Sequence, residues 1–328
     1  MSLSIKDVAQ RAGCSIATVS RVLAGKGYIS DEARQKVEAA VTELGYRPNR
    51  VARSLRAQKS RVIGLILSDI CNPFFSEISR AVERVAIRHG YSVLICNTDE
   101  DPQKEAHYLQ LLEEEKVAGI LLSPTRASAK SLDPALLPPL VLFDRKFPTV
   151  HLDSVVIDNE EAAMKLTRTL LDGGYRKIAG LFGAKSFTAS GRIAGFKAAF
   201  QGMEERMHGI YQAPAFEEEG NRLMKEVLKQ EPAVDAVVCS SALLATGAYR
   251  ALRESGVRMP AEMGFACFDD PSWAGFVEPP VTVIRQPATA IGEAAAELLM
   301  KRIEDPARPV SEIGLRGELI ERGSSRRG

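Results

Sequence analysis

Charged and hydroxyl side chains directly follow several apolar runs of this sequence, and such positions suit ligand binding. The set comprises Ser68, Asp69, Ser123, Asp144, Arg145, Asp269 and Asp270, with Phe74 and Arg192 near the starts of two predicted helices. Carboxylates and arginines can share the hydroxyl groups of a sugar while an aromatic ring covers its apolar face. Each residue alone would more often be a helix cap or a surface ion pair. Their recurrence after successive runs predicts one pocket for a small hydroxylated molecule.

The sequence lacks the motifs that the common enzyme classes need. It contains no G-x-G-x-x-G, no phosphate-binding G-x-x-x-x-G-K-[ST], no G-x-S-x-G and no H-E-x-x-H. Asp269 and Asp270 are adjacent at a strand end, so their side chains point in opposite directions and do not form an acid/base pair. We therefore expect no enzymatic activity and no cofactor.

The cysteines and histidines form no metal-binding pattern. The five cysteines, Cys14, Cys71, Cys96, Cys239 and Cys267, lie far apart without a C-x-x-C pair, and the four histidines have no ligand spacing. We therefore expect buried free thiols, no disulfide framework and no metal site.

Alternating strands and helices from residue 61 onward position the pocket residues. The predicted strands cover 62–67, 91–96, 117–122, 140–143, 177–182, 236–239 and 264–268. The predicted helices cover 74–89, 102–115, 159–171, 190–201, 217–229 and 243–254. Near-continuous Val/Ile/Leu strands between helices indicate parallel sheets covered on both faces. Two such series predict two doubly wound α/β lobes, with the pocket between them at the carboxyl ends of the strands.

The N-terminal residues predict a different activity. Ser4 and Asp7 fit a capping box at the start of a first helix, Gly13 permits a tight turn, and Ser15 can cap a second helix over 15–23. The inward-facing residues of the second helix are Val19, Val22 and Leu23, which leaves Ile16, Ala17, Thr18, Ser20 and Arg21 to face a partner. Two helices joined this way form a helix-turn-helix, which inserts its second helix into the DNA major groove.

A third helix and a basic linker complete this N-terminal region. Ser30 can cap the helix and Gly45 can end it. Residues 47–60 contain four arginines and Leu55, and two turns of helix after Pro48 would be marginal without support. Basic residues around an exposed leucine suit a wedge that kinks DNA from the minor groove. A flexible basic linker is the alternative.

Charge is distributed unevenly along the 328 residues. Residues 1–60 carry a net charge of +6 and the remainder −5, for a total of +1. A basic segment on a mildly acidic body is typical of a DNA-binding head on a domain that does not touch phosphates. The chain is 45% apolar and 26% charged, and no apolar run approaches the roughly 18 residues of a membrane helix. We expect a cytoplasmic protein with no membrane partner.

These motifs together resemble the lactose-repressor/galactose-repressor (LacI/GalR) family of bacterial transcription regulators. The N-terminal matches are IKDVA at 5–9, ATVSRVL at 17–23, GYRPN at 45–49 and ARSL at 52–55. The later matches are NPFF at 72–75, GF at 195–196, FDD at 268–270, PPVTVIRQP at 279–287 and ERGS at 321–324. The resemblance covers essentially the whole chain.

The resemblance implies an all-α helix-turn-helix headpiece at 1–46, a hinge helix or linker at 47–60 and a periplasmic-binding-protein-like core at 61–328. The implied N-lobe covers about 61–157 and 286–315, and the C-lobe about 158–285 and 316–328. A homodimer is also implied, because a two-fold operator in double-stranded DNA requires two heads.

Site residues follow from the same resemblance. The implied base-reading residues are Ile16, Ala17 and Arg21; the implied backbone contacts are Thr18, Ser20, Tyr28 and Asn49; Leu55 would be the wedge, with Ala52 beside it. The implied effector-binding residues are Phe74, Ser123, Asp144, Arg145, Arg192 and Asp269, with Phe216 as an aromatic wall.

The expected function is a repressor whose operator affinity is controlled by a small sugar or sugar acid. Ser241 and Ala242 stand where many sugar-binding members have Asn-Asp, and the loss of that carboxylate beside Arg126, Arg145 and Arg192 favours an acidic ligand. The alternatives are a transcriptional activator of the same family, or a sugar-binding receptor, which would have no use for residues 1–60.

Overall fold

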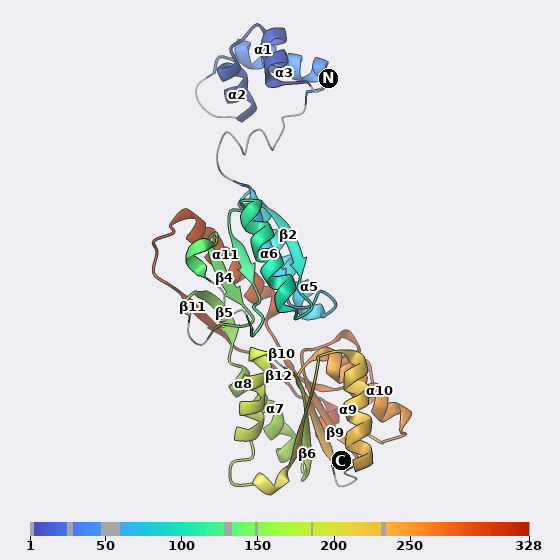
Figure 1. The fold of residues 1–328 in the computed structure, drawn as a ribbon. Helices are drawn as coiled ribbons and strands as arrows, with labels where there is room; N and C mark the ends of the chain where they lie inside the picture. Colours follow the sequence, from blue (N-terminus) through green and yellow to red (C-terminus); the bar gives the residue numbers. More distant parts are fainter. Residues whose placement is uncertain are drawn as a thin grey trace. The chain divides into compact units, whose positions relative to one another are not determined.

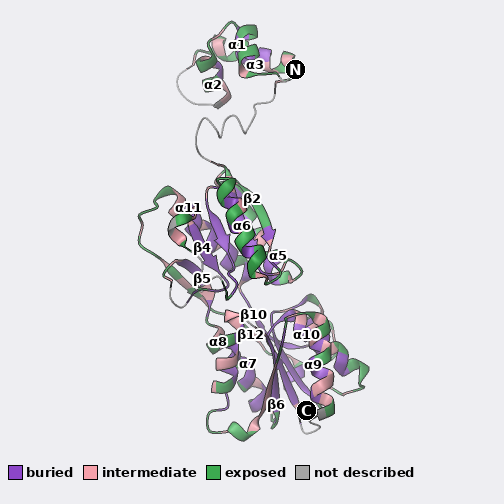
Figure 2. Ribbon diagram, in the orientation of Figure 1, coloured by how far each residue is buried: buried purple, intermediate pink, exposed green. Residues whose placement is uncertain are grey.

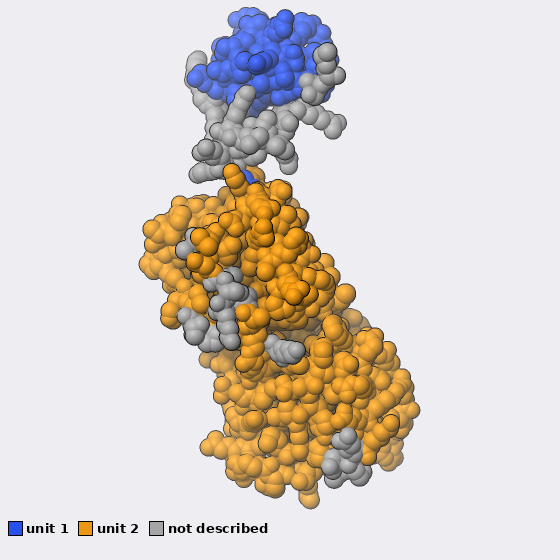
Figure 3. All heavy atoms as spheres, viewed as in Figure 1, with its two compact units in different colours: residues 1–60 blue, residues 61–328 orange. Residues whose placement is uncertain are grey.

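A computed structural model describes residues 3–24, 29–46, 60–127, 133–147, 150–184, 186–230 and 234–327. The chain divides into two compact units, Met1–Ser60 and Arg61–Gly328 (Figure 3). Four predicted DNA contacts, Tyr28, Asn49, Ala52 and Leu55, lie outside the described residues, and so does the hinge helix or linker expected at 47–60, apart from Ser60. Within the described ranges, no helix is both long enough and apolar enough to cross a membrane.

Three short helices make up the described part of the first unit. They are α1 (Ile5–Ala12), α2 (Ile16–Ala24) and α3 (Asp31–Leu44) (Figure 1). Both predicted helix starts are confirmed: the backbone N of Ser4 donates to Asp7 Oδ2 at 2.7 Å, and Thr18 N donates to Ser15 Oγ at 3.1 Å. Gly13 makes the turn with φ 62°. The shared core consists of Val8, Ala9, Ala12, Val19, Val37 and Ala40.

The N-lobe of the second unit is built on a six-stranded parallel sheet of order β11-β5-β4-β3-β1-β2. Its strands are β1 (Val62–Leu67), β2 (Ser92–Asn97), β3 (Ile120–Leu122), β4 (Leu140–Phe143), β5 (Asp153–Ile157) and β11 (Glu312–Leu315). On one face, α5 (Pro73–Arg88) and α11 (Ala288–Glu304) pack together; α6 (Pro102–Glu114) covers the other.

The C-lobe repeats this arrangement with sheet order β12-β10-β9-β8-β6-β7, in which only β12 runs antiparallel to its neighbour. Its strands are β6 (Ile178–Gly183), β7 (Met207–Ala213), β8 (Ala236–Cys239), β9 (Gly264–Phe268), β10 (Thr282–Arg285) and β12 (Glu318–Ile320). Its helices are α7 (Asn159–Asp172) and α8 (Phe187–Ala198) on one face, with α9 (Glu217–Gln230) and α10 (Ala242–Glu254) on the other. Short 3₁₀ turns cover Pro134–Leu136, Glu204–Arg206, Ser272–Gly275 and Gly323–Ser325.

This architecture confirms the predicted fold class, and the differences concern individual elements. The helix expected from Ser190 begins at Phe187, because Ser186 Oγ accepts from Ala189 N at 3.0 Å and caps it earlier. Strand β7 was not predicted, because it lies at a sheet edge and its half-buried residues form no apolar run. Strands β5, β10, β11 and β12 and helix α11 were also not predicted.

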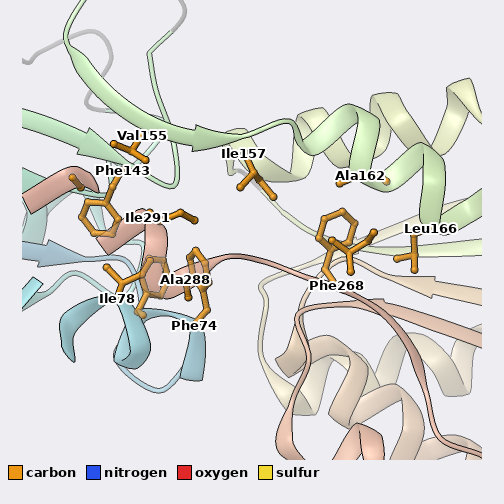
Figure 4. Close-up of a cluster of buried hydrophobic side chains, with 14 of the residues drawn as sticks. Phe74, Ile78, Phe143, Val155, Ile157, Ala162, Leu166, Phe268, Ala288 and Ile291 are labelled. Atoms are coloured by element: carbon orange, nitrogen blue, oxygen red, sulfur yellow. The ribbon is translucent and has the colours of Figure 1, made fainter. Parts of the chain in front are cut away.

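The inner strands of both sheets are buried, whereas the edge strands β2, β7, β11 and β12 and the outer helix faces are half-buried or exposed (Figure 2). The largest apolar cluster extends from the N-lobe into the C-lobe, and Ile157 lies between the groups around Phe143 and Phe268 (Figure 4). The chain passes between the two sheets at Asp158, at 286–287 and at 316–317. The lobes therefore share apolar contacts where the chain crosses between them.

The expectation that all cysteines are buried is wrong for two of them. Cys96, Cys239 and Cys267 are buried free thiols, whereas Cys71 is exposed and Cys14 is partly exposed. Burial raises the pKa of Cys239 and Cys267, so both thiols stay protonated and unreactive.

Candidate functional site

A cleft of about 1000 Å³ lies between the two lobes, at the carboxyl ends of the strands. The charged residues that line it are Asp69, Asp99, Glu100, Arg126, Asp144, Arg145, Arg192 and Asp269, and its aromatic residues are Phe74, Phe75 and Phe216. A cleft of this size is typical of small-molecule sites, in which a few polar groups fix the ligand among apolar walls.

Asp144 is a buried carboxylate directly after β4. Its Oδ2 accepts from Arg145 Nε at 3.0 Å and from Ser123 Oγ at 3.3 Å, while no described residue donates to Oδ1. Burial raises the pKa of Asp144, although Arg145 and Arg192 act to lower it. Burial of the Asp144 carboxylate carries a desolvation cost. A ligand hydroxyl that donated to it would reduce this cost.

Ser123, expected at the cleft wall, lies behind it instead. Its Oγ is fully buried, 2.9 Å from Ser68 Oγ and within hydrogen-bond distance of Asp144. Both serines follow neighbouring parallel strands, β1 and β3, so they form a layer beneath the cleft floor. Ser123 therefore supports Asp144 and does not face the ligand space.

Arg145 is buried and enclosed by acceptors. Its guanidinium donates to both oxygens of Glu100, at 2.8 and 2.5 Å, in addition to Asp144. Burial acts to lower the pKa of Arg145, but the Glu100 and Asp144 carboxylates raise it overall. Arg145 is thus a permanent cation with its charge already paired inside the protein.

Arg192 is the buried arginine of the C-lobe wall. Its Nε donates to Asn159 Oδ1 at 2.7 Å, its Nη1 donates to the Ser240 carbonyl, and its Cζ lies 4.0 Å from the centroid of the Phe268 ring. Burial lowers its pKa, and the charges of Asp269 and Asp144 oppose that effect. No described residue accepts from Nη2, so this nitrogen is available to a ligand.

Asp269 follows β9 and connects two chain segments. Its Oδ2 accepts from Ala242 N at 2.9 Å, and its Oδ1 accepts from Gln286 Nε2 at 2.7 Å. Gln286 lies in the segment that returns to the N-lobe, and its buried Oε1 has no hydrogen-bond partner among the described residues. A ligand that contacts these two residues would touch the lobe connection directly.

The aromatic wall comes mainly from the start of α5. Asn72 caps this helix by accepting from Phe74 N at 3.0 Å, and Pro73 occupies its first turn. The rings of Phe74 and Phe75 are 5.1 Å apart and edge-to-face, which holds both in place. Phe216 also lines the cleft and is 48% exposed.

The lobes touch at one rim of the cleft. Arg126 donates to Ser190 Oγ at 3.2 Å, and its Cζ lies 5.7 Å from the ring centroid of Phe187. The same ring packs edge-to-face on Phe147 at 6.2 Å. Arg126 and Phe147 follow N-lobe strands and Phe187 begins α8, so these contacts connect the two lobes.

Most residues expected at the pocket therefore line one cleft, and several lining residues were not anticipated. The expected residues that line it are Phe74, Asp144, Arg145, Arg192, Phe216 and Asp269. The unanticipated ones include Glu100 and Gln286, which follow β2 and β10. Both residues follow a strand, so the pattern that identified the other pocket residues could have identified them too. Strand β10 was not predicted, however, and the residues of the turn after β2 were not considered as pocket residues.

The second surface with a distinct chemistry is the outer face of α2. Ile16, Ala17, Ser20 and Arg21 are exposed and Thr18 is partly exposed, while Val19 is fully buried in the head core. Ile16 is 40% exposed and presents an apolar side chain on this face. This face combines apolar, hydroxyl and guanidinium groups, as base-edge contacts in a major groove require.

Two family models match the chain. Residues 4–49 match the bacterial regulatory proteins of the lacI family, and residues 60–316 match the periplasmic binding proteins and sugar binding domain of the LacI family. The chain is 36% identical to the ribose operon repressor of Halalkalibacterium halodurans, over 99% of this chain and 98% of that repressor.

Solved structures agree with the family models. The Lac repressor dimer bound to operator and the anti-inducer ONPF superimposes with a TM-score of 0.89 at 25% identity, covering 99% of this chain and 100% of that one. A LacI family transcriptional regulator from Enterococcus faecium with bound ribose gives a TM-score of 0.72 at 26% identity, covering 81% and 98%. The chain therefore belongs to the LacI family of bacterial regulatory proteins, with a helix-turn-helix unit and a periplasmic-binding-protein-like core.

Proposed function

We propose that this protein is a dimeric, sequence-specific transcriptional repressor whose operator affinity is controlled by a small neutral sugar bound between the lobes. The observation that carries the proposal is the placement of Arg192 near two carboxylates, Asp144 and Asp269, in a cleft with an aromatic wall. A diol can accept from the guanidinium and donate to the carboxylates, and its apolar face can pack on Phe74.

The choice of a neutral sugar over a sugar acid follows from the charges in the cleft. Five carboxylates and three guanidinium groups line it, and Arg145 is already paired with Glu100 and Asp144. Arg126 lies at the rim and binds Ser190. A ligand carboxylate near Arg192 would also meet Asp144 and Asp269, so the absence of an acid at Ser241 and Ala242 does not make the cleft cationic. The ribose named in two relatives is a neutral sugar.

The DNA contacts are proposed from the face of α2. Ile16, Ala17 and Arg21 read base edges, while Thr18 and Ser20 contact the DNA backbone. By resemblance to the family, Tyr28 and Asn49 add backbone contacts, and Leu55 is the minor-groove wedge with Ala52 beside it.

A homodimer provides the two heads that a two-fold operator needs. Ile87 near the end of α5 and Leu94 and Ile95, on the two faces of the edge strand β2, expose apolar side chains, and a second copy that packs along this edge would cover them. An open strand edge with exposed leucine and isoleucine would favour aggregation unless a partner covered it. The related Lac repressor is a dimer when bound to operator.

Effector binding is coupled to the lobe arrangement through the crossing segments. Arg192 is bonded to Asn159 beside the first crossing, and Asp269 is bonded to Gln286 in the second. A sugar that bridges Asp144 of one lobe and Asp269 of the other binds one relative orientation of the lobes more tightly than the alternatives. It therefore favours that orientation. That orientation determines whether the two heads and linkers of the dimer bind operator together.

The test combines selection of genomic DNA fragments with a thermal-shift screen of sugars, followed by operator titration with each hit. We expect a selected duplex to bind at least about 1000-fold tighter than random duplex at physiological salt, and one neutral sugar to change that affinity tenfold or more. A loss of affinity identifies an inducer and a gain identifies a co-repressor. Equal binding of random and selected duplex would refute the proposal.

A further inference from the structure

Glu100 is the acidic partner that encloses Arg145 from the side of the cleft. Its two carboxylate oxygens accept from Nη1 and Nη2 of Arg145 at 2.8 and 2.5 Å, the two-pronged geometry of the strongest ion pairs. Arg145 is 6% exposed and Glu100 43% exposed, and both line the cleft, so Glu100 is the more accessible member of the pair.

The backbone around Glu100 is fixed in a conformation that non-glycine residues seldom adopt. Asp99 and Glu100 both have positive φ, 52° and 59°. Glu100 N donates to the Ser68 carbonyl at 3.1 Å, and Asp101 Oδ1 accepts from Gln103 N at 2.8 Å to cap α6. A left-handed glutamate persists only where its surroundings hold it, and such residues cluster at ligand sites. The turn therefore aims this carboxylate at Arg145.

Without Glu100, Nη1 and Nη2 of Arg145 would have no carboxylate partner, and an acidic ligand in the cleft could bind them. Asp144 binds only Nε, and the Pro124 carbonyl lies 3.4 Å from Nη1. Nη1 and Nη2 are the pair that could bind a ligand carboxylate, and Glu100 occupies both. Asp99, the adjacent cleft carboxylate, binds Lys104 and Asn97 instead and leaves Arg145 untouched.

We propose that Glu100 is a specificity-determining residue that makes the cleft select neutral sugars over sugar acids, by occupying the guanidinium that a ligand carboxylate would otherwise bind. The inference rests on the proposed sugar-binding function. It assigns the preference for neutral over acidic sugars to Glu100. Glu100 acts through Arg145 and is a positioning residue.

The experiment measures affinity for matched neutral and acidic sugars on the full chain by titration calorimetry. The probes are D-ribose with D-ribonate, D-glucose with D-glucuronate, and D-galactose with D-galacturonate. The wild type is expected to bind the neutral member of the best pair more tightly. Glu100→Gln should shift the affinity ratio toward the acid by about tenfold or more, since it removes a like charge and leaves only one acceptor oxygen for Nη1 and Nη2 of Arg145.

Two further variants separate this effect from a structural one. Asp99→Asn removes the neighbouring cleft carboxylate and should shift the ratio clearly less than Glu100→Gln does, because it removes a like charge but no acceptor of Arg145. Glu100→Asp keeps the charge and should retain the neutral preference. A general loss of folding would lower affinity for both members of a pair and leave their ratio unchanged.

The outcomes distinguish this inference from the proposed function. An unchanged ratio in Glu100→Gln with intact sugar binding, an equal shift in Asp99→Asn, or a wild type that prefers the acid would overturn the role of Glu100 alone. If none of the six sugars bound to the wild type and no other neutral sugar did, the sugar effector itself would be refuted, and this inference with it.

Discussion

Asp144 and Asp269 occupy equivalent positions in the two lobes. Each directly follows the third strand from the same edge of its sheet, β4 and β9, and each has a left-handed backbone, with φ 64° and 66°. Aspartate tolerates this conformation better than most residues, and in both lobes it turns the carboxylate into the cleft. The two lobes thus present matching acceptors from opposite walls.

Substitution of Asp144 by asparagine should stabilise the ligand-free protein while abolishing effector binding. Burial raises the pKa of Asp144, so its ionised form at neutral pH costs folding free energy. We expect the melting temperature to rise by a few degrees at pH 7. The gain should shrink as pH falls through the folded-state pKa toward the ordinary value of 3.8, because the wild-type carboxyl then becomes neutral.

Asp270→Asn is the matched control, and its effect on the melting temperature should have the opposite sign. Burial acts to raise the pKa of Asp270, but hydrogen bonds from Arg322 and Arg285 lower it overall. Its stabilising effect is present above the ordinary pKa and is lost as pH falls through the folded-state value. Asp270→Asn should therefore lower the melting temperature at pH 7. Scanning calorimetry from pH 8 to below pH 3.8 checks both, and equal signs for the two variants at pH 7 would contradict this account.

Arg192→Lys should weaken effector binding by about 100-fold without weakening operator binding in the absence of effector. A lysine cannot donate to Asn159 and Ser240 while also facing the ligand and packing on Phe268. Arg222→Lys, on the exposed face of α9, should change neither affinity. Calorimetry and operator anisotropy measure the two effects, and a parallel loss of operator binding would show that Arg192 acts on the fold.

Arg21→Ala should reduce operator affinity about tenfold or more, because Arg21 is exposed on the α2 face proposed to read bases. Arg34→Ala removes the same charge from the exposed face of α3 and serves as the control. Anisotropy titrations against selected and random duplex compare the variants. A loss that is the same for both duplexes, or the same for both variants, would exclude base reading by Arg21.

Leu94→Lys should convert the dimer to a monomer, because it places a charge in the apolar surface proposed for the second copy. Leu94 is 38% exposed on the edge strand β2. Leu136→Lys, at a 70% exposed site in a 3₁₀ turn, should leave the dimer intact. Sedimentation equilibrium measures the mass of each protein in solution. A wild type with the mass of a single chain, 35.7 kDa, would refute the dimer.

Local interactions made much of this protein predictable. The helix-turn-helix follows from caps and apolar spacing within 45 residues: Ser4 with Asp7, Ser15 with Thr18, and Val19 in the core. The alternating apolar runs likewise identified the parallel sheets, since strands buried on both faces are apolar throughout. Strand β7 escaped because its residues, MHGIYQA, contain no continuous apolar run.

The sequence by itself determined which side chains stand at strand ends, and therefore that Asp144, Arg145 and Asp269 meet at one cleft. Only the tertiary structure decided how their charges are paired. Glu100 and Arg145 are 45 residues apart, and Asp269 and Gln286 come from different segments. Strand periodicity fixes the face and end at which a residue lies, whereas hydrogen-bond partners depend on how distant segments pack. Ser241 and Ala242 alone favoured an acidic ligand, and only the folded chain shows that Arg145 already binds Glu100 and Asp144 and that Arg126 binds Ser190.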